Sequence, residues 1–306
     1  MMNHYIYNTF LTASGMDYKQ YQYDGVEWCV LNELRLHPPH NVRGGFIADE
    51  MGLGKTITMI GTMICNRVRK TLIIVPPVLL SQWNMQIYKT TKYKSIVYYG
   101  EEKKHITRET IYAKPTAIVL ATYASLNSSL LQSIEWDRVI FDEAHHLKNS
   151  QTKIFGFASL LRAKIRWLVS GTPIQNRASE FRNLCTILKL PKEAKKELSF
   201  HANFILKRTK SQVNIIIPDK HISTQLIEWG NKEEKTLSEN IHSTLSFNRH
   251  PDSTLKASIS MLMRARQICI YPKLVKKHET LPLYNNEIQF SSKLDAVVKS
   301  ITEKKN

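Results

Sequence analysis

The chain has 306 residues, 42% of them hydrophobic, so it can bury a core in one large domain or two smaller ones, and disorder throughout is excluded. Lysine and arginine outnumber aspartate and glutamate by 43 to 26, and the net charge of +17 suits a polyanion such as DNA or RNA, although a soluble protein can be this basic without one. The four cysteines form no CxxC pair and no apolar run is long enough to span a bilayer, so neither zinc nor a membrane is indicated.

Residues 1–191 alternate short apolar runs with helical patterns. Helical periodicity covers 56–69 and 179–190, where apolar residues recur on one face. The apolar runs are rich in branched residues, as expected for strands buried on both faces, and they lie at 45–48, 71–75, 95–99, 117–122, 138–142 and 166–170. Strands that alternate with helices predict an α/β fold with a parallel, doubly wound sheet.

The pattern changes after Pro191, which ends the preceding helix. Segments 193–201, 232–246 and 254–270 have the spacing of helices with charged faces and show no clear strand alternation. We therefore expect a mainly helical region over residues 192–285.

The segment 44–56, GGFIADEMGLGKT, is an apolar strand that runs into a glycine-bearing turn and then a helix. Gly52 and Gly54 let the backbone approach phosphates without a Cβ clash, and N–H groups of the loop and helix start face the anion. Lys55 is expected to neutralise the β- and γ-phosphates of ATP, and Thr56 to hold Mg²⁺. The generic loop has glycine where this chain has Asp49, and GKT can occur by chance in a turn, but the flanking strand and helix favour a phosphate loop.

The segment 138–149, RVIFDEAHHLKN, is an apolar strand that ends in two adjacent acids. Ligands collect at the carboxyl ends of parallel strands, so Asp142 is expected beside the phosphate loop, holding Mg²⁺ through water. Glu143 is expected to polarise the attacking water. The alternative is a pair of surface acids that end a strand.

The segment 168–176, LVSGTPIQN, is a strand followed by a Gly-Thr-Pro turn and a helix. Taken alone it is an ordinary turn. In this chain the segment comes third, after the phosphate loop and the acidic pair, and we expect the polar groups of Ser170, Thr172 and Gln175 to lie at the same edge of the sheet.

These ordered segments resemble the Swi/Snf-type ATPases, which are double-stranded-DNA translocases of the second helicase superfamily. DEMGLGKT at 49–56 is that family's own form of the phosphate loop, which accounts for Asp49. Tyr21 and Gln22 with GVEW at 25–28 resemble its adenine-recognising segment. Further similarities are LIIVPPVLLSQW (72–83) to motif Ia, TYASL (122–126) to a DNA-contacting motif, DEAHHLKN and SGTPIQN to motifs II and III, FILKRTKSQV (204–213) with IPDK (217–220) to the exit from lobe one, MRARQICIYPKLV (263–275) to the helix before lobe two, and SSKLDAVVKSI (291–301) to its opening. Tyr18, Ser170 and Tyr271 depart from the usual leucine, threonine and histidine.

The resemblance implies a RecA-like P-loop NTPase fold, with ATP-binding lobe one at 1–191, a helical insertion and linker at 192–285, and the start of a truncated second lobe at 286–306. It implies ATP and Mg²⁺ as cofactors. The site residues it assigns are Gln22, Asp49, Gly52, Leu53, Gly54, Lys55 and Thr56 for ATP, Thr56 and Asp142 for Mg²⁺, Glu143, Asp142 and Lys55 for catalysis, and Ser170, Gly171, Thr172 and Gln175 for coupling.

No glycine-rich motif V and no Q-x-x-R-x-x-R segment of motif VI occurs in the sequence. In the family the arginines of motif VI complete the ATP site from the second lobe, and such arginines contribute ~10³–10⁵ in rate in related enzymes. Arg264 and Arg266 are no substitute because they belong to the helix before lobe two. We therefore expect hydrolysis to need a second lobe, from a longer chain or a separate polypeptide.

The resemblance also implies a DNA track across the sheet edge. Its candidate contacts to phosphate or sugar are Gln82, Trp83, Thr122 and Tyr123. A tryptophan after an apolar strand is also a common core residue. A basic cluster of Lys207, Arg208 and Lys210 fits either DNA phosphates or a solvated face equally well.

The expected function is an ATP-dependent translocase on double-stranded DNA that remodels chromatin or protein–DNA complexes, with a lean toward repair from motif Ia. One alternative is a catalytically weak regulatory or remnant protein that binds ATP and DNA. A DEAH-type RNA helicase is disfavoured, because that group has Ser-Ala-Thr in place of SGTPIQN. The expected location is the nucleus, or a viral factory or the cytoplasm if the gene is viral.

Overall fold

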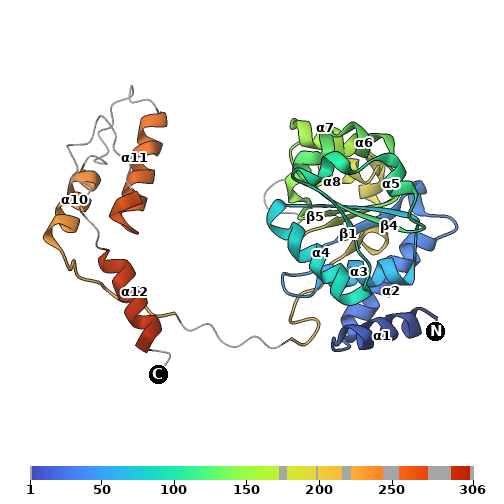
Figure 1. Cartoon of the computed structure of the whole chain (residues 1–306), viewed down its shortest axis with the longest axis horizontal. Coiled ribbons are helices and arrows are strands. Elements are labelled where there is room, and N and C mark those ends of the chain that lie inside the picture. Colours follow the sequence, from blue (N-terminus) through green and yellow to red (C-terminus); the bar gives the residue numbers. More distant parts are fainter. Residues whose placement is uncertain are drawn as a thin grey trace. The chain divides into compact units, whose positions relative to one another are not determined.

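The computed structural model describes residues 2–171, 178–197, 199–215, 222–243, 255–274 and 291–303. Contacts divide the chain into two units, Met1–Ile217 and Pro218–Asn306, and each is described by itself. Figure 1 labels several elements of each unit. Within the described ranges, no helix combines the length and the apolar character needed to cross a membrane.

The first unit is built on a seven-stranded sheet in the order β3-β4-β2-β5-β6-β1-β7, and every pairing in it is parallel. All six residues of β4 are buried, as are the last five of β2, which explains their continuous apolar sequences. The strands are β1 (Arg43–Ile47), β2 (Lys70–Val75), β3 (Ile96–Tyr98), β4 (Ala117–Thr122), β5 (Glu135–Asp142), β6 (Arg162–Val169) and β7 (Ile205–Leu206). The expected doubly wound, RecA-like α/β fold is confirmed.

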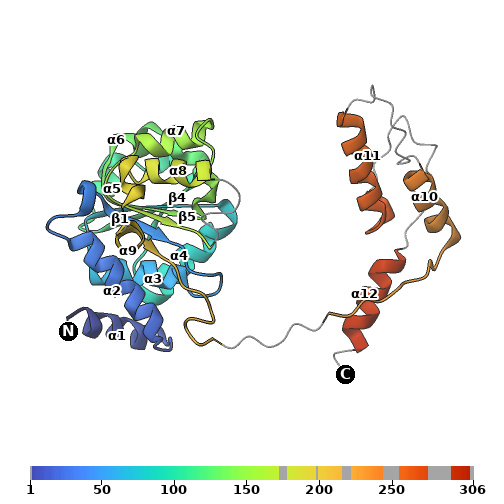
Figure 2. The same ribbon diagram turned by 180° about the vertical axis from the view of Figure 1, so that it is seen from behind.

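Alternate residues of each strand pack into two separate cores, one on each face of the sheet. In β2, Leu72 and Ile74 belong to one core and Ile73 and Val75 to the other. Figures 1 and 2 show the two helical layers. The layer over Ile73 and Val75 is formed by α1 (Met2–Ser14), α2 (Gln20–Leu34), α3 (Lys55–Cys65) and α4 (Pro77–Thr91), and the other by α5 (Arg108–Tyr112), α6 (Ser129–Ser133), α7 (Lys153–Leu160), α8 (Ala178–Ile187) and α9 (Phe200–Phe204).

Short 3₁₀ turns connect several of these elements. They are η1 (Pro39–Asn41), η2 (Glu102–His105), η3 (Tyr123–Asn127), η4 (Ala144–Leu147) and η5 (Glu193–Lys196). Two of them, η3 and η4, directly follow β4 and β5 and so lie at the carboxyl edge of the sheet, where the candidate site residues collect.

The edge strand β7 corrects the expected boundary after residue 191. Ile205 and Leu206 pair with Phe46 and Ile47 of β1, so residues beyond 191 complete the sheet, and the division between the units falls after Ile217. In place of the single helix expected at 193–201, the structure has the 3₁₀ turn η5 and, separately, the short helix α9. A two-residue strand is too short to produce a recognisable alternation in sequence.

The described part of the second unit is helical, as expected. It contains α10 (Lys232–Ser243), α11 (Leu255–Ile268), the turn η6 (Pro272–Leu274) and α12 (Ser292–Glu303). Leu237 and Ile241 of α10 are buried, and the carboxylate of Glu234 accepts hydrogen bonds from the backbone N–H and the hydroxyl of Ser292 at the start of α12. That α12 opens a second lobe remains a prediction.

A buried ion pair ties α2 to the sheet of the first unit. The side chains of Glu33 in α2 and Arg138 in β5 are at most 1% exposed. Arg138 Nε donates to Glu33 Oε1 at 2.6 Å, and Trp167 Nε1 donates to the same oxygen at 2.7 Å. Asn66 Nδ2 donates to Glu33 Oε2 at 2.7 Å, so both carboxylate oxygens are satisfied inside the fold.

Candidate nucleotide-binding site

The loop between β1 and α3 has a backbone that requires glycine at two positions. Gly52 and Gly54 have φ angles of 90° and 81°, in the left-handed region that other residues rarely adopt. A Cβ on Gly54 would lie 2.4 Å from Nε2 of Gln22, so a side chain there would also displace the end of that glutamine. The segment therefore forms the tight turn expected from its sequence.

The start of α3 is suited to an anion. Gly54 is the N-cap residue and no side chain caps the helix, so the first-turn N–H groups can bind a phosphate at the positive end of the helix dipole. Lys55 Nζ donates to the main-chain oxygens of Asp49 at 2.9 Å and Glu50 at 3.4 Å. Phosphate oxygens can replace these two carbonyl acceptors. Thr56 follows in the same turn and is partly exposed, as an Mg²⁺ ligand has to be.

Burial lowers the pKa of Lys55, and the negative charges of Glu143, Asp49 and Asp142 oppose that shift. The two acids at the end of β5 therefore lie close enough to the phosphate-loop lysine to affect its charge. This is the juxtaposition that the sequence predicted, and it follows from the sheet order β5-β6-β1, which brings the carboxyl ends of these strands to one edge.

Asp142 is 7% exposed and held by two donors. Trp83 Nε1 donates to Oδ2 at 2.6 Å, and the backbone N–H of Glu143 donates to Oδ1 at 3.0 Å. Burial is the main cause that raises the pKa of Asp142, whereas the bond from Trp83 and the charge of Lys55 act in the opposite direction. The carboxylate is thus fixed in orientation, which suits a metal ligand.

Glu143 has a left-handed backbone (φ 51°) that turns the chain sharply away from β5. Its side chain is 29% exposed, and Oε2 lies 3.1 Å from Nδ1 of His145. A partly exposed carboxylate beside a buried one has the access to solvent that a water-polarising group needs.

The third motif contacts the phosphate loop from β6. The backbone N–H of Ser170 donates to the main-chain oxygen of Ile47 at 3.0 Å, which continues the pairing of β6 with β1. A Cβ on Gly171 would lie 2.8 Å from Cγ of Met51 and 3.2 Å from Nζ of Lys55. Gly171 therefore packs directly against the loop, whereas Thr172 and Gln175 lie outside the described residues.

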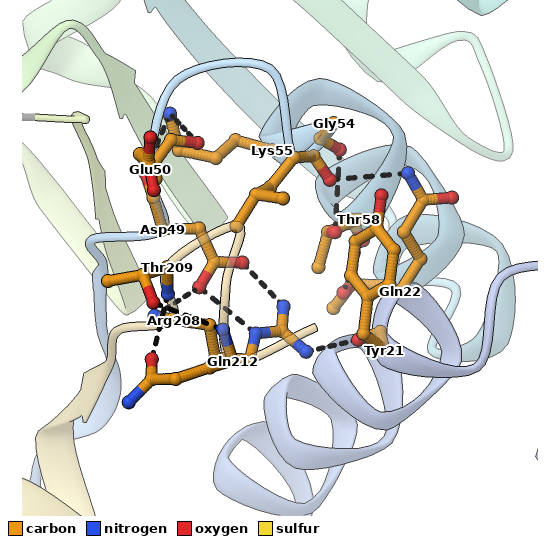
Figure 3. A network of polar contacts seen from close by, with 12 residues as sticks. Tyr21, Gln22, Asp49, Glu50, Gly54, Lys55, Thr58, Arg208, Thr209 and Gln212 are labelled. Carbon is orange, nitrogen blue, oxygen red and sulfur yellow. Dashed lines mark hydrogen bonds and ion pairs between the residues drawn. The ribbon is translucent and has the colours of Figure 1, made fainter. Parts of the chain in front are cut away.

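Residues 21–28 at the start of α2, which resemble the family's adenine-recognising segment and are called the adenine-type segment below, also reach the loop. Gln22 is buried, and its Nε2 donates to the main-chain oxygen of Leu53 at 3.2 Å. Beside Tyr21 an open pocket of about 900 Å³ is lined by residues of α2, of β7 and of the segment after β7, among them Trp28, Leu206 and Arg208. Figure 3 shows Tyr21 and Gln22 to the right of the loop residues Asp49 and Lys55.

Three of the four candidate DNA contacts require correction. Trp83 is 1% exposed and bound to Asp142, Thr122 is 2% exposed and lies 3.1 Å from the Ser125 hydroxyl, and Tyr123 donates its buried hydroxyl to the main-chain oxygen of Asp142. Trp83 and Tyr123 contact Asp142 from within the lobe, and the Thr122 side chain is buried, so we revise the expectation that these three side chains touch DNA. Gln82 is exposed on α4 and remains a candidate.

The place of Arg208 also differs from the expectation. In the structure its guanidinium lies against Asp49, which is fully buried, and not on a solvated face. A signal was present, because a carboxylate in a tight loop beside a core strand needs a cation if it is buried. Lys207, the preceding residue, is exposed, and Lys210 Nζ lies 3.7 Å from Glu50.

Residues 21–202 match the SNF2-related domain family. The chain is 27% identical to the DNA repair protein rad8 of Schizosaccharomyces pombe, over 76% of this chain and 27% of that protein. It is 28% identical to the "Probable global transactivator" of Orgyia pseudotsugata multicapsid polyhedrosis virus, over 84% of this chain and 56% of that protein.

Among solved structures, the chain resembles the Sulfolobus solfataricus SWI2/SNF2 ATPase core in complex with dsDNA, with a TM-score of 0.54 and 27% identity. The match covers 94% of this chain and 64% of that one, so the chain spans less than two thirds of the length of these relatives. The family match covers more than half of the chain and contains the phosphate loop, the acidic pair and the third motif. The chain belongs to the SNF2-related domain family.

Proposed function

We propose that this chain is the ATP-binding lobe of an ATP-dependent translocase on double-stranded DNA, which remodels chromatin or other protein–DNA complexes, with a role linked to repair. The observation that carries the proposal is the placement of Lys55, Asp142 and Glu143 at one edge of a RecA-like sheet. The name of the rad8 relative and the DNA-bound solved relative support the choice of pathway and substrate.

The residues of this site have distinct tasks in ATP hydrolysis. Lys55 and the first-turn N–H groups of α3 bind the phosphates, and Gln22 supports the loop beside the base. Thr56 and Asp142 would hold Mg²⁺, which neutralises charge on the phosphates when it is bound. Glu143 orients the attacking water and accepts its proton. Gly171 lies against both the loop and Lys55, so a shift of the third motif would be felt by the nucleotide.

Full hydrolysis, in this proposal, also needs a second lobe that supplies arginines to the γ-phosphate. Arg208 lies beside the loop, but its guanidinium is bound to Asp49 and so does not serve as such an arginine. The second lobe would be part of a longer chain or a separate polypeptide. Action in the nucleus fits the repair relative, and a viral factory or the cytoplasm fits the viral relative.

A DNA-stimulated ATPase assay tests the proposal. The chain is assayed with and without duplex DNA, alone and together with a supplied second lobe, and Lys55→Ala serves as the control. We expect stimulation by duplex DNA in the reconstituted pair and none in the Lys55→Ala variant. Absence of stimulation in the pair refutes the translocase, and effective competition by RNA but not by duplex DNA points to an RNA helicase.

A second candidate is a regulatory module that binds ATP and DNA but turns over little. The 306 residues contain no Q-x-x-R-x-x-R segment, and this candidate applies if neither a longer chain nor another polypeptide supplies one. Rapid DNA-stimulated turnover by this chain alone, lost in Lys55→Ala, excludes that candidate. Binding of ATP without stimulated turnover in the reconstituted pair supports it.

A further inference from the structure

Asp49, the residue that replaces the usual glycine of the phosphate loop, is fully buried and bound by a single arginine from far along the chain. Oδ1 of Asp49 accepts from the backbone N–H of Arg208 at 3.0 Å and from its Nε at 3.1 Å. Oδ2 forms an ion pair with Nη2 of the same guanidinium. Such a two-pronged, charge-assisted contact fixes the direction of the carboxylate as well as neutralising it.

The other side of the guanidinium contacts the adenine-type segment. Nη1 of Arg208 donates to the main-chain oxygen of Tyr21, and the guanidinium carbon lies 5.7 Å from the centre of the Tyr21 ring. A Cβ on Gly25 would lie 2.8 Å from Nη2, so the glycine leaves room for the arginine. Arg208 therefore joins the start of α2 to the phosphate loop, as the dashed contacts in Figure 3 show.

The chain around Arg208 runs alongside the first half of the loop. The backbone N–H of Ala48 donates to the Leu206 oxygen at 2.7 Å, and the N–H of Glu50 donates to the Arg208 oxygen at 2.9 Å. The backbone N–H of Lys210 donates to Oε2 of Glu50 at 2.8 Å. These bonds extend the β1–β7 pairing into the loop, with Asp49 at the centre of the contact.

The position of Asp49 matters because its main-chain oxygen is the nearer acceptor of Lys55 Nζ, at 2.9 Å. A residue that holds Asp49 therefore also sets where the phosphate-binding ammonium rests. We propose that Arg208 is a positioning residue for ATP binding, which holds the phosphate loop and the adenine-type segment in register through Asp49 and Tyr21. This inference rests on the proposed function, because it assigns Arg208 to the same ATP site.

The alternative role, in which Arg208 acts as a surface cation toward DNA phosphates, requires a free guanidinium. Its side chain is only 16% exposed, and Asp49 and Tyr21 occupy its donors on two sides. Lys207 has the same charge, is exposed and adjoins Arg208 in the chain. It therefore provides a matched control for the loss of one positive charge at this place.

The experiment compares Arg208→Gln with Lys207→Gln in the full chain, by titration with a fluorescent ATP analogue in the presence of Mg²⁺ and by thermal unfolding without nucleotide. We expect Arg208→Gln to weaken nucleotide binding about tenfold or more, the scale of a lost charge-assisted contact. Lys207→Gln should change it by about twofold or less, as for an exposed charge. Arg208→Lys, which keeps the charge but not the two-pronged geometry, should recover only part of the affinity.

Arg208→Gln leaves Asp49 buried without a cation and can lower the folded fraction, so the double variant Asp49→Asn/Arg208→Gln is measured as well. It removes both charges, and we expect it to unfold at nearly the temperature of the unaltered chain while its nucleotide affinity stays low. A purely structural role predicts the opposite, namely unchanged affinity in the folded protein. That result overturns the inference.

The control Lys55→Ala separates the inference from the proposed function. If Lys55→Ala abolishes nucleotide binding but Arg208→Gln does not weaken it, the ATP site stands and only the role of Arg208 is wrong. If the unaltered chain does not bind the analogue, the proposed function is overturned and the inference falls with it. Equal losses in Arg208→Gln and Lys207→Gln also overturn the inference, because they indicate a general effect of charge.

Discussion

Removing the charge of Glu33 should destabilise the first unit far more than removing the charge of a surface glutamate. In Glu33→Gln the guanidinium of Arg138, 1% exposed, stays in the interior without a counter-charge. Breaking one side of a buried pair costs about 3–5 kcal/mol. The amide oxygen can keep the bond from Trp167 Nε1. The amide nitrogen then faces the donors Asn66 Nδ2 and Arg138 Nη2, so the variant loses both the charge and the acceptor for these two bonds.

The chain contains a matched control for this measurement. Glu135 and Arg162 form a pair of the same residue types at 3.6 Å, but their side chains are 71% and 59% exposed. An exposed pair contributes about 0–1 kcal/mol, so Glu135→Gln should be close to neutral. The difference of several kcal/mol between the two variants is a large share of the roughly 5–15 kcal/mol that keeps a domain folded.

Urea unfolding followed by tryptophan fluorescence measures both variants, since Trp167 itself contacts Glu33. We expect a clearly lower midpoint for Glu33→Gln and an unchanged slope for both variants. If the two midpoints fall by the same small amount, the buried pair is not what holds α2 on the sheet. A loss in Glu135→Gln as large as in Glu33→Gln refutes the reasoning from burial.

Three further predictions concern the site. Glu143→Gln should keep ATP affinity and lower the hydrolysis rate at least about 10²-fold, because the amide keeps the shape of the side chain but cannot accept the proton. Equal losses of affinity in a binding assay and of rate in a phosphate-release assay contradict the role of Glu143 as the water-polarising group. Gly171→Ala places a Cβ 3.2 Å from the ammonium of Lys55 and should weaken ATP binding. In the control Gly156→Ala, in α7, the Cβ meets nothing within 4 Å, so the unfolding temperature should rise slightly. Titration with nucleotide and thermal unfolding of both variants test the two expectations. Trp83→Phe removes a hydrogen bond that lowers the pKa of Asp142, so the pKa of Asp142 should rise further and the acidic limb of kcat/KM should move to higher pH. A pH–rate profile of the unaltered chain and of the variant measures this, and a shift of the limb to lower pH contradicts the prediction.

The sequence predicted those parts of the fold whose signals are local and repeated. Six of the seven strands were visible as runs of branched residues because each is buried on both faces, as the six buried residues of β4 illustrate. The phosphate loop was visible because the backbone at Gly52 and Gly54 has positive φ angles that other residues rarely adopt. Their order along the chain then predicted the edge of the sheet at which the acids would meet the loop.

The sequence did not predict features that depend on which distant side chains meet. Trp83 and Tyr123 both bind Asp142, and in the sequence nothing separates a tryptophan or tyrosine that supports an acid from one that touches DNA. Arg208 looked like one member of a basic cluster, and only the pairing of β7 with β1 places it over Asp49. Contacts over some 160 residues are set by topology, which a reading of local patterns does not contain.

The strand β7 decides how the lobe can be divided. The family match ends at residue 202, three residues before β7 begins. A fragment cut there would leave β1 as an open edge whose unpaired N–H and C=O groups can pair with another molecule. It would also leave the buried carboxylate of Asp49 without its guanidinium, so the shorter fragment should aggregate, whereas one that continues through Ile215 keeps its sheet covered at that edge.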